Sequence, residues 1–414
     1  MGTTMTTMLG TALAMFTGGC ATDWQPAFDE AAPANLFDDV MIADPDEALT
    51  FARIGAPGQR RLLAVTRYHG GVLSAVDLSS AGGGRPRQDA GELLLELGYD
   101  GVRDLVRGAA GSTRLAVPVA DLVIPVDVHD HHIAAATNFP EHAGDAGVEK
   151  GPFLFAKLVT PTESTSTVST RGGLLDYEVE VAWLTFAPLT QDAKAAPGTS
   201  AAPGSNDSPK TKATAQPALI GLILANDYTD RETLLHHINP FDVESGDGFT
   251  TGKSAPGWLP LGNLLVVPRD HRAFVRDLEL RLYVNGSLRQ RSMVKEMIWD
   301  FDEVVAHTFA WNDKRWEHRG EQVSLLGASP DSIPAHTLIL SGTPHGTVFA
   351  GLRARHFLGG LGRWLMGGWS RAPMHSVADA YAADARSASA YLQPGDKVDI
   401  HVERLGVLRN TITP

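Results

Sequence analysis

The sequence has a single cysteine, Cys20, among its 414 residues, so it cannot form an internal disulfide framework. Basic residues are in deficit: 35 Lys and Arg against 48 Asp and Glu give a net charge of −13. Because nucleic acids and anionic membranes are bound by basic faces, this charge argues against both as partners. The sequence also has no internal repeat and no long alternation of strand and helix patterns. A doubly wound sheet is therefore disfavoured, and a mixed, mostly antiparallel β fold with peripheral helices is expected.

The apolar run Met8 to Phe16 is too short to span a bilayer and resembles the core of a signal peptide. The following Thr17-Gly18-Gly19-Cys20 resembles the processing site of bacterial lipoproteins, although no Lys or Arg precedes the run and Thr17 replaces the usual aliphatic residue. We therefore interpret residues 1–35 as a leader and tether. Two alternatives stay open: an exported protein anchored in the cell envelope by a lipid on Cys20, or a disordered leader on a cytoplasmic enzyme.

What the chain does contain indicates a large globular protein rich in turns, with 43% hydrophobic residues, 42 Gly and 25 Pro. Residues 36–124 are expected to form a small N-terminal domain that contains a β-hairpin around His69-Gly70 and carries no reactive group. The main domain is expected to span residues 125–414 and to contain a hairpin turn at Asn285-Gly286 and a helix from Val294 to His307. It is interrupted by two insertions, 191–216 and 352–386, the first of which is of low complexity.

Two glutamates stand out in the segment Leu174 to Trp183, whose pattern predicts a β-strand. Residues i and i+2 of a strand share one face, so Glu178 and Glu180 should direct two carboxylates to the same place. Carboxylates held together repel unless a proton or a cation intervenes, and a hard divalent cation takes oxygen ligands. The alternative is an edge strand with two solvated glutamates.

Asp227 follows the apolar run 218–225, which predicts a buried strand, and it could complete a site of three carboxylates with the two glutamates. Alternatively, Asp227 caps a helix that begins near Thr229. Lys253 lies in a glycine-flanked loop, where it could stabilise a developing oxyanion beside a cation or could simply be solvated.

His142 and Asp145 are three residues apart, which suits a carboxylate that orients an imidazole for general-base activation of water. A surface pair at the start of a helix is the alternative. The His129-Asp130-His131-His132 cluster suggests zinc, but no matching set of Cys or His lies at a familiar spacing. The turn 341–346 could bind a carboxylate through its backbone N–H groups, or it could be a plain turn.

The order and spacing of these motifs, from about Pro125 to Thr413, resemble the fumarylacetoacetate hydrolase family. The motifs in chain order are Asn-aromatic-x-x-His-x-x-acid (138–145), Glu-x-Glu (178–180), Asn-Asp-x-Thr-x-Arg (226–231), Gly-Lys-Ser (252–254), Asn-Gly-x-x-x-Gln (285–290), Gly-Thr-Pro-x-Gly (342–346), Pro-Gly-Asp (394–396) and Leu-Arg-Asn-Thr (408–411). The resemblance implies a mixed, mostly β (α+β) fold, a β-sandwich roll with peripheral helices. It also implies a homodimer and a small-molecule carboxylate substrate.

The resemblance also implies roles for individual residues. The implied ligands of a divalent metal, usually Mg²⁺ or Mn²⁺, are Glu178, Glu180 and Asp227. The implied catalytic residues are the water-activating pair His142 and Asp145 and the lysine Lys253. The implied substrate-binding residues are Lys157, Arg231 and Thr343.

Some features depart from the family pattern. Asp145 stands where the partner of the histidine is usually glutamate, and Asp127 and Asp130 are near, but not in register with, a fourth metal carboxylate of some members. The leader and the two insertions are not typical, so the resemblance does not extend to the natural substrate or the location.

The resulting hypothesis is a metal-dependent hydrolase that cleaves a C–C bond in a 2-oxo or 1,3-dicarbonyl acid of the acylpyruvate or fumarylacetoacetate type. The cation would stabilise an enolate, and His142 would activate water. A decarboxylase, isomerase or hydratase of a 2-oxo acid on the same scaffold is an alternative. Two further alternatives are a non-catalytic, envelope-anchored binding protein and a purely structural role for the carboxylates.

Overall fold

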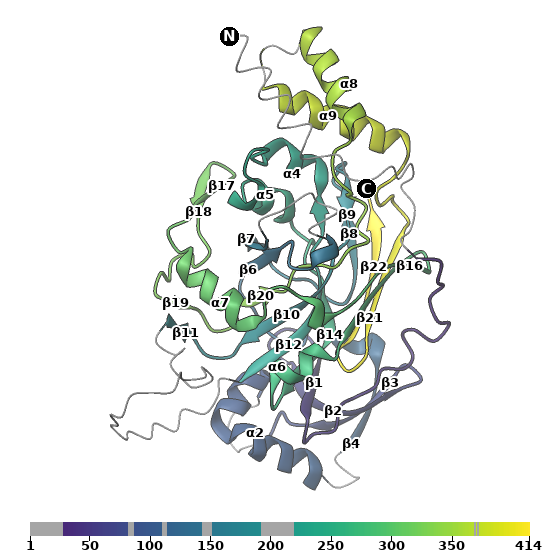
Figure 1. Ribbon diagram of the computed structural model, residues 1–414. Helices are drawn as coiled ribbons and strands as arrows, with labels where there is room; N and C mark the ends of the chain where they lie inside the picture. The colour runs from purple at the N-terminus through teal and green to yellow at the C-terminus, as the bar shows by residue number, and fades with distance from the viewer. Residues whose placement is uncertain are drawn as a thin grey trace, which may run out of the picture.

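Two β-sheets pack face to face in the computed structural model of the chain, and helices cover the outer face of the larger sheet (Figure 1). The structure describes residues 28–81, 87–109, 114–142, 151–191, 219–367, 370 and 372–414. Cys20, Asp145 and residues 192–216 of the first insertion, on which several predictions fall, lie outside the described residues.

The larger sheet has eleven strands in the order β4-β3-β2-β1-β14-β12-β10-β20-β6-β7, with β5 paired to β1. Its neighbouring strands are antiparallel except for β20 and β6. The strands are β1 (Ala48–Ile54), β2 (Arg61–His69), β3 (Val72–Asp77), β4 (Arg114–Pro118), β5 (Leu122–Val123), β6 (His131–Ala136), β7 (Phe153–Leu158), β10 (Val179–Thr185), β12 (Ile220–Asn226), β14 (Leu261–Pro268) and β20 (Leu338–Leu340). Pairing of β1 with β14 joins the strands of segment 36–124 to the rest of the sheet through backbone hydrogen bonds.

The smaller sheet has five strands, in the order β16-β15-β21-β22-β8. They are β8 (Thr165–Ser169), β15 (Glu279–Val284), β16 (Ser287–Met293), β21 (Lys397–Val402) and β22 (Gly406–Thr413). The turn between β15 and β16 has φ of 50° at Asn285 and 80° at Gly286, and the tightest hairpin turns require positive φ at both positions. The predicted Asn-Gly hairpin is thus confirmed.

Three strand pairs lie outside these sheets. They are β9 (Leu175–Asp176) with β13 (Thr229–Asp230), β11 (Leu189–Thr190) with β19 (Ser332–Ile333), and β17 (Trp316–His318) with β18 (Glu321–Val323).

Strand β10 lies at the centre of the molecule, and both of its faces are buried. Side chains of one parity pack in the core that includes the smaller sheet; they are Val179, Val181 and Trp183. The side chains of Ala182 and Leu184 pack in the second core, which includes helices α2, α4 and α5. The alternation of side chains along a strand places Glu178 and Glu180 on this second, helix-covered face.

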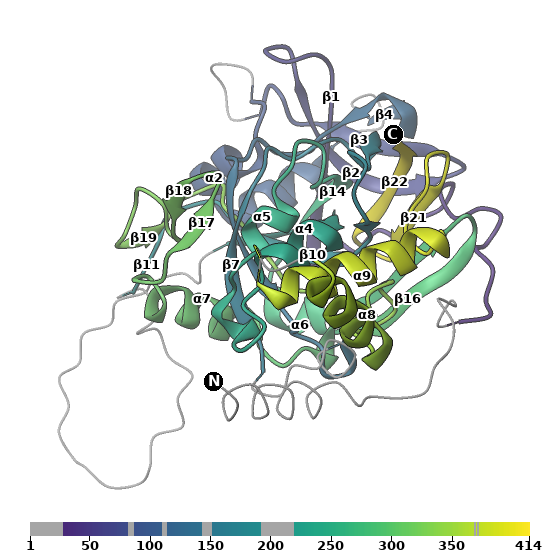
Figure 2. The ribbon, with the colours of Figure 1, turned by 90° about the horizontal axis from the view of Figure 1, so that it is seen from above.

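The helices are α2 (Ala90–Gly108), α4 (Arg231–His237), α5 (Phe249–Lys253), α6 (His271–Arg276), α7 (Phe301–Ala310), α8 (Ala354–Leu365) and α9 (Pro373–Ser387). Single 3-10 turns are η2 (Val119–Asp121), η4 (Val243–Ser245) and η5 (Val294–Glu296). The second predicted insertion forms α8 and α9, which pack on each other, and α9 also packs on α4 beside the site (Figure 2). Within the described part of the chain, no helix combines the length and the apolar character needed to cross a bilayer.

The mixed α+β fold with mostly antiparallel sheets confirms the predicted fold class. Two local predictions were wrong. The single strand expected from Leu174 to Trp183 is broken after Asp176, because the N–H of Glu178 donates to the side-chain oxygen of Asn226 (2.9 Å) in place of a strand carbonyl. The helix expected from Val294 begins only at Phe301, where Asp300 caps it through the N–H of Glu303.

Candidate metal centre and active site

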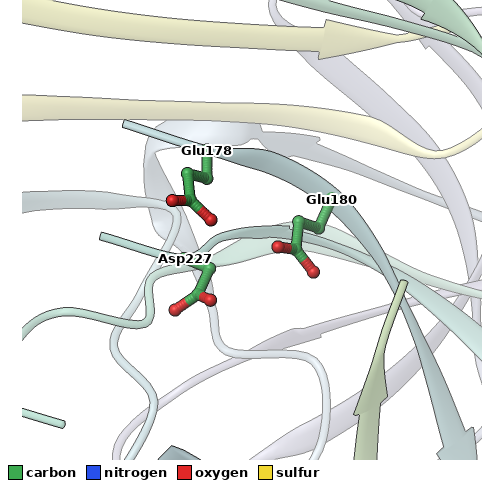
Figure 3. A group of neighbouring side chains, drawn as sticks. All are labelled: Glu178, Glu180 and Asp227. Carbon is green, nitrogen blue, oxygen red and sulfur yellow. The ribbon is translucent and has the colours of Figure 1, made fainter. Parts of the chain in front are cut away.

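Three buried carboxylates converge at the end of β10, as Figure 3 shows. Glu178, Glu180 and Asp227 each offer one oxygen, and these oxygens all lie within 4.8 Å of one another. The antiparallel pairing of β10 and β12 brings them together, because Val179 lies opposite Asn226 and the N–H of Asp227 donates to the carbonyl of Glu178 (2.9 Å). The alternative prediction, that Asp227 caps a helix, was wrong, because Asp230 caps α4.

Two of the three carboxylates are paired with cations. Lys253 Nζ lies 2.5 Å from Glu178 Oε2 and 2.8 Å from Asp227 Oδ2. Arg231 Nη2 donates to Glu178 Oε1 at 2.6 Å, and Lys157 Nζ contacts Asp227 Oδ1. Burial alone would raise the pKa of Glu178, but the charges of Lys253 and Arg231 outweigh burial and lower this pKa to about 2.

Glu180 has no such partner among the described residues. Its Oε2 accepts the N–H of Gly342 at 2.8 Å, and its Oε1 is buried without a hydrogen bond. Burial, reinforced by the neighbouring charges of Asp227 and Glu178, raises the pKa of Glu180 well above its usual value. A carboxyl group in this position holds a proton or requires a further cation.

A divalent cation fits this cluster. The buried carboxylates at the site are Asp176, Glu178, Glu180 and Asp227, and the buried cations are Lys157, Arg231 and Lys253. With all four carboxyl groups ionised, one negative charge would be left over, and Glu180 is the carboxylate that no described cation pairs. Carboxylate oxygens are the ligands that Mg²⁺ and Mn²⁺ prefer, so the donor set suits either ion.

Arg231 is held in place by a carboxylate that the sequence analysis did not assign to the site. Asp176 Oδ2 accepts from Arg231 Nε at 2.8 Å, and the same carboxylate accepts the backbone N–H groups of Val348 and Phe349. The arginine is thereby fixed beside Glu178. Asp176 shares the i, i+2 parity of the two glutamates, which is the signal that could have identified it.

His142 lines the same cavity as Glu178, Arg231 and Lys253, and it is buried. Burial, together with the positive charges of Arg231 and Lys253, lowers the pKa of His142 to about 4, so the imidazole is neutral near pH 7. Its Nδ1 has no hydrogen-bond partner among the described residues, and its predicted partner Asp145 lies outside them.

Asn138 anchors the segment that carries this histidine. Its Nδ2 donates to the carbonyls of Trp299 and Ser341, each at 2.9 Å, and its Oδ1 accepts the N–H of Trp299 at 2.7 Å. Asn138 thus connects the segment that carries His142 to the 341–346 turn through a hydrogen bond.

The 341–346 turn does bind a carboxylate through backbone N–H, but this carboxylate is the protein's own Glu180. Thr343 lines the cavity, while its hydroxyl donates to the Val179 carbonyl (3.0 Å) and accepts from Gln290 Nε2 (2.9 Å). The Oε1 of Gln290 in turn accepts the N–H of Val179 (3.0 Å). Gln290 therefore fixes the turn against β10.

The cavity beside the three carboxylates measures about 800 Å³ including its open mouth. Its polar end is lined by Thr137, His142, Glu178, Arg231, Lys253 and Thr343. Two of the three N–H groups of Lys253 donate to acceptors among the described residues, namely the carboxylates of Glu178 and Asp227. The remaining N–H leaves Lys253 able to contact a bound molecule.

Residues 131–413 match the family model described as fumarylacetoacetate (FAA) hydrolase C-terminal. This match covers more than half of the chain and includes Glu178, Glu180 and Asp227, together with His142 and Lys253. The chain belongs to the fumarylacetoacetate hydrolase family. Its members are enzymes that act on small molecules and typically depend on a divalent metal, and the buried acidic cluster of this chain fits such a metal.

Solved structures agree with the family fold. Similar chains are a fumarylacetoacetate hydrolase from Exiguobacterium antarcticum (18% identity, TM-score 0.50, covering 88% of this chain and 99% of that chain), a putative HpcE protein from Mycobacterium smegmatis (19%, 0.52, 88% and 100%) and maleylpyruvate hydrolase from Sphingobium sp. SYK-6 (16%, 0.50, 88% and 99%). At these identities the likeness establishes the fold.

A sequence relative is protein MJ1656 of Methanocaldococcus jannaschii, 34% identical over 82 residues. The match covers 20% of this chain and 33% of the archaeal protein, so the chain spans only a third of that relative.

Lys157, which the family pattern assigns to substrate, does not line the described cavity. Its three N–H groups contact Asp227 Oδ1 and the carbonyls of Lys253 and Trp258, the last at 3.0 Å. No donor is left for a substrate, so the geometry favours a role in holding Asp227 and the end of α5. Lys253 itself is the last residue of α5. The prediction that it lies in a loop was therefore wrong.

The remaining polar candidates lie apart from the cluster. Asp127 pairs with Arg53 and Arg60, and Asp130 is not among the grouped carboxylates of the described residues. The nearby histidines are bonded separately to the backbone: His129 to the carbonyl of Ala335 (2.9 Å), His131 to that of Ser324 (2.9 Å), and His132 to the N–H of Leu338 (3.4 Å).

Proposed function

We propose that the protein is a divalent-metal-dependent hydrolase that cleaves a C–C bond in a 2-oxo or 1,3-dicarbonyl acid of the acylpyruvate type. The observation that carries this proposal is the convergence of Glu178, Glu180 and Asp227 in one cavity with a buried, neutral His142. An acid cluster alone would suit a metal-binding protein. The neighbouring imidazole of His142, whose Nδ1 has no partner among the described residues, supports chemistry on water.

Glu178, Glu180 and Asp227 would hold the metal, and Lys253 and Arg231 would face the substrate. A bound divalent cation supplies Lewis-acid polarisation of the adjacent oxygens of a 2-oxo acid. The third N–H of Lys253, which has no acceptor among the described residues, can donate to an oxygen on which negative charge develops. Arg231, fixed by Asp176 and Glu178, adds positive charge at the same end of the cavity.

His142 would act as the base. Its neutral imidazole takes a proton from water, and the hydroxide adds to the acyl carbonyl carbon of the substrate. The bond between that carbon and the neighbouring methylene then breaks, and the methylene receives a proton. An acylpyruvate and one water thus yield a carboxylic acid and pyruvate. Decarboxylation, isomerisation and hydration of 2-oxo acids remain alternatives, and the first two need no activated water.

Metal removal gives the first test. We expect that protein stripped with a chelator does not convert an acylpyruvate, and that Mg²⁺ or Mn²⁺ restores conversion, because the bound cation supplies the Lewis-acid polarisation of the substrate. The products are identified after incubation with acetylpyruvate and, separately, with oxaloacetate. Pyruvate and acetate from acetylpyruvate support hydrolysis. Release of CO₂ from oxaloacetate, with acetylpyruvate left intact, would favour a decarboxylase instead.

The second test removes the base. His142→Gln is expected to lower kcat for acylpyruvate hydrolysis by about 10²–10⁴-fold, the usual contribution of general-base catalysis. Mn²⁺ affinity, measured by calorimetry, should stay within about threefold because His142 is not one of the three carboxylate ligands. His129→Gln, on the neighbouring segment and bonded only to a backbone carbonyl among the described residues, is the matched control. An unchanged kcat in His142→Gln would remove water activation by this residue from the proposal.

A further inference from the structure

The cavity has a second, apolar end that the proposed chemistry does not use. Beyond the carboxylates it is lined by Leu234 and Ile238 of the α4 region, Phe249 of α5, Phe349, Leu352 and Met374. Leu234, Phe249 and Leu352 are buried in the protein, whereas Ile238, Phe349 and Met374 are half-buried. The result is a hydrocarbon wall that continues directly from the polar end.

The helical insertion builds one side of this wall. Leu352 lies just before α8, and Met374 lies in the first turn of α9. Helix α9 is fixed to α4 by the ion pair of Arg386 with Glu232 (2.9 Å) and by contacts of His236 with Asp379 (3.2 Å) and His375 (3.1 Å). Figures 1 and 2 both show α9 lying beside α4. The insertion is therefore a built part of the cavity and not a separate appendage.

Among the described residues, none that lines the apolar end of the cavity is charged. Among the described residues that line the cavity, the charged side chains are Glu178, Arg231 and Lys253, and all three belong to the ion-pair network at the polar end. A second carboxylate carried on a substrate tail would be desolvated there without a partner, at a considerable cost in free energy. A hydrocarbon tail would instead gain from leaving water.

We propose that this site selects 2-oxo acids with a long, uncharged hydrocarbon tail over those that end in a second carboxylate, and that Leu352 and Met374 of the insertion determine this specificity. The inference rests on the proposed function for the position of the 2-oxo acid group at the polar end. The tail then lies between α4, α5 and the start of α9.

Binding of simple 2-oxo acids tests the tail separately from turnover. Calorimetry on Mn²⁺-loaded protein measures Kd for straight-chain 2-oxo acids from pyruvate to 2-oxodecanoate, and for 2-oxo dicarboxylates of equal length. Each methylene that enters the wall should lower Kd by about fourfold (~0.8 kcal/mol). The dicarboxylate of equal length should bind at least about tenfold more weakly, because no described residue at the apolar end can pair with its far carboxylate.

Variants locate the effect. Met374→Asp places a charge on the wall and should abolish most of the gain in affinity per methylene. Met374→Leu keeps the side chain apolar and should retain this gain. Leu358→Asp is the matched control, since Leu358 lies on the adjoining helix α8, is 72% exposed and is not among the lining residues. This control should keep the full dependence on chain length. Thermal unfolding of each variant shows whether it is still folded, so that weaker binding caused by the altered wall can be distinguished from unfolding.

A Kd that does not depend on chain length, or equal losses in Met374→Asp and Leu358→Asp, overturns the inference while leaving metal-dependent hydrolysis untouched. Tight, length-dependent binding of 2-oxo acids without any conversion of acylpyruvates supports the apolar wall and overturns the proposed reaction. Preference for the dicarboxylate overturns the assignment of the tail directly.

Discussion

Replacing Glu180 by glutamine is expected to stabilise the metal-free protein and to abolish metal binding, two effects of opposite sign. The stabilisation arises because Glu180 is a buried carboxyl group next to Asp227 and Glu178, and its Oε1 has no partner among the described residues. Glutamine keeps an oxygen for the N–H of Gly342 and removes the repulsion. We expect a gain of about 1–4 kcal/mol in the unfolding free energy, by analogy with the range found when buried ion pairs are replaced by uncharged residues.

The pH dependence of stability should change in the same experiment. The pKa of Glu180 is raised in the folded protein, so over the range between its unfolded and folded pKa values the folded state holds a proton that the unfolded chain has lost. Through this residue, the stability of the metal-free protein falls as the pH rises from about 4.5 upward. Glutamine does not titrate, so this part of the decline should be missing from urea unfolding curves of Glu180→Gln.

Glu178→Gln is the matched comparison, because it makes the same chemical change two residues away. Glu178 is paired with Lys253 and Arg231, and removing its charge leaves both buried cations short of a partner. We therefore expect Glu178→Gln to destabilise the metal-free protein by about 3–5 kcal/mol. Both variants should weaken Mn²⁺ binding by more than about 100-fold, since each loses a direct ligand. A purely structural cluster would instead show no change in metal content in either variant.

Loss of the metal should also abolish turnover in both variants. Lewis-acid stabilisation is worth several kcal/mol, and about 4 kcal/mol corresponds to a factor of about 10³ in rate. Activity of Glu180→Gln at the wild-type level in saturating Mn²⁺ would contradict the metal site.

The sequence predicts those parts of the molecule that depend on local pattern. The parity of Glu178 and Glu180 places two carboxylates on one face, and the Asn285-Gly286 turn sets a hairpin by its own backbone preference. The motif order identifies the family, and the family pattern assigns Asp227 to the same cluster of carboxylates. These inferences need only near neighbours in the chain or a recognisable spacing.

Other features depend on partners far away in the sequence. The strand break at Glu178 exists because the side chain of Asn226 replaces a strand carbonyl, and Asp176 belongs to the site because Arg231 reaches it from α4. Asp176 shares the i, i+2 parity of the two glutamates, but the sequence pattern indicates neither its contact with Arg231 nor the contact of Asn226 with Glu178. The apolar wall likewise forms only when the insertion packs on α4, which composition alone does not indicate.

Lys157→Met is expected to cause a large loss of stability although it keeps all three carboxylates. Lys157 is wholly buried and contacts Asp227 and the carbonyls of Lys253 and Trp258. Methionine fills a similar volume but leaves a buried carboxylate with one cation fewer and two carbonyls without a donor. We expect the unfolding free energy of the metal-free protein to fall by about 3–5 kcal/mol.

The same variant separates the two roles of Lys157. Saturating Mn²⁺ should recover part of the loss, because the cation compensates the charge of Asp227 but provides nothing for the two carbonyls. Lys295→Met, an exposed lysine in η5, should stay within about 0.5 kcal/mol of the wild type in urea unfolding. If Lys157 instead served the substrate, as the family pattern implies, its replacement would raise KM and leave unfolding unchanged. Its three internal contacts make the opposite result the expected one.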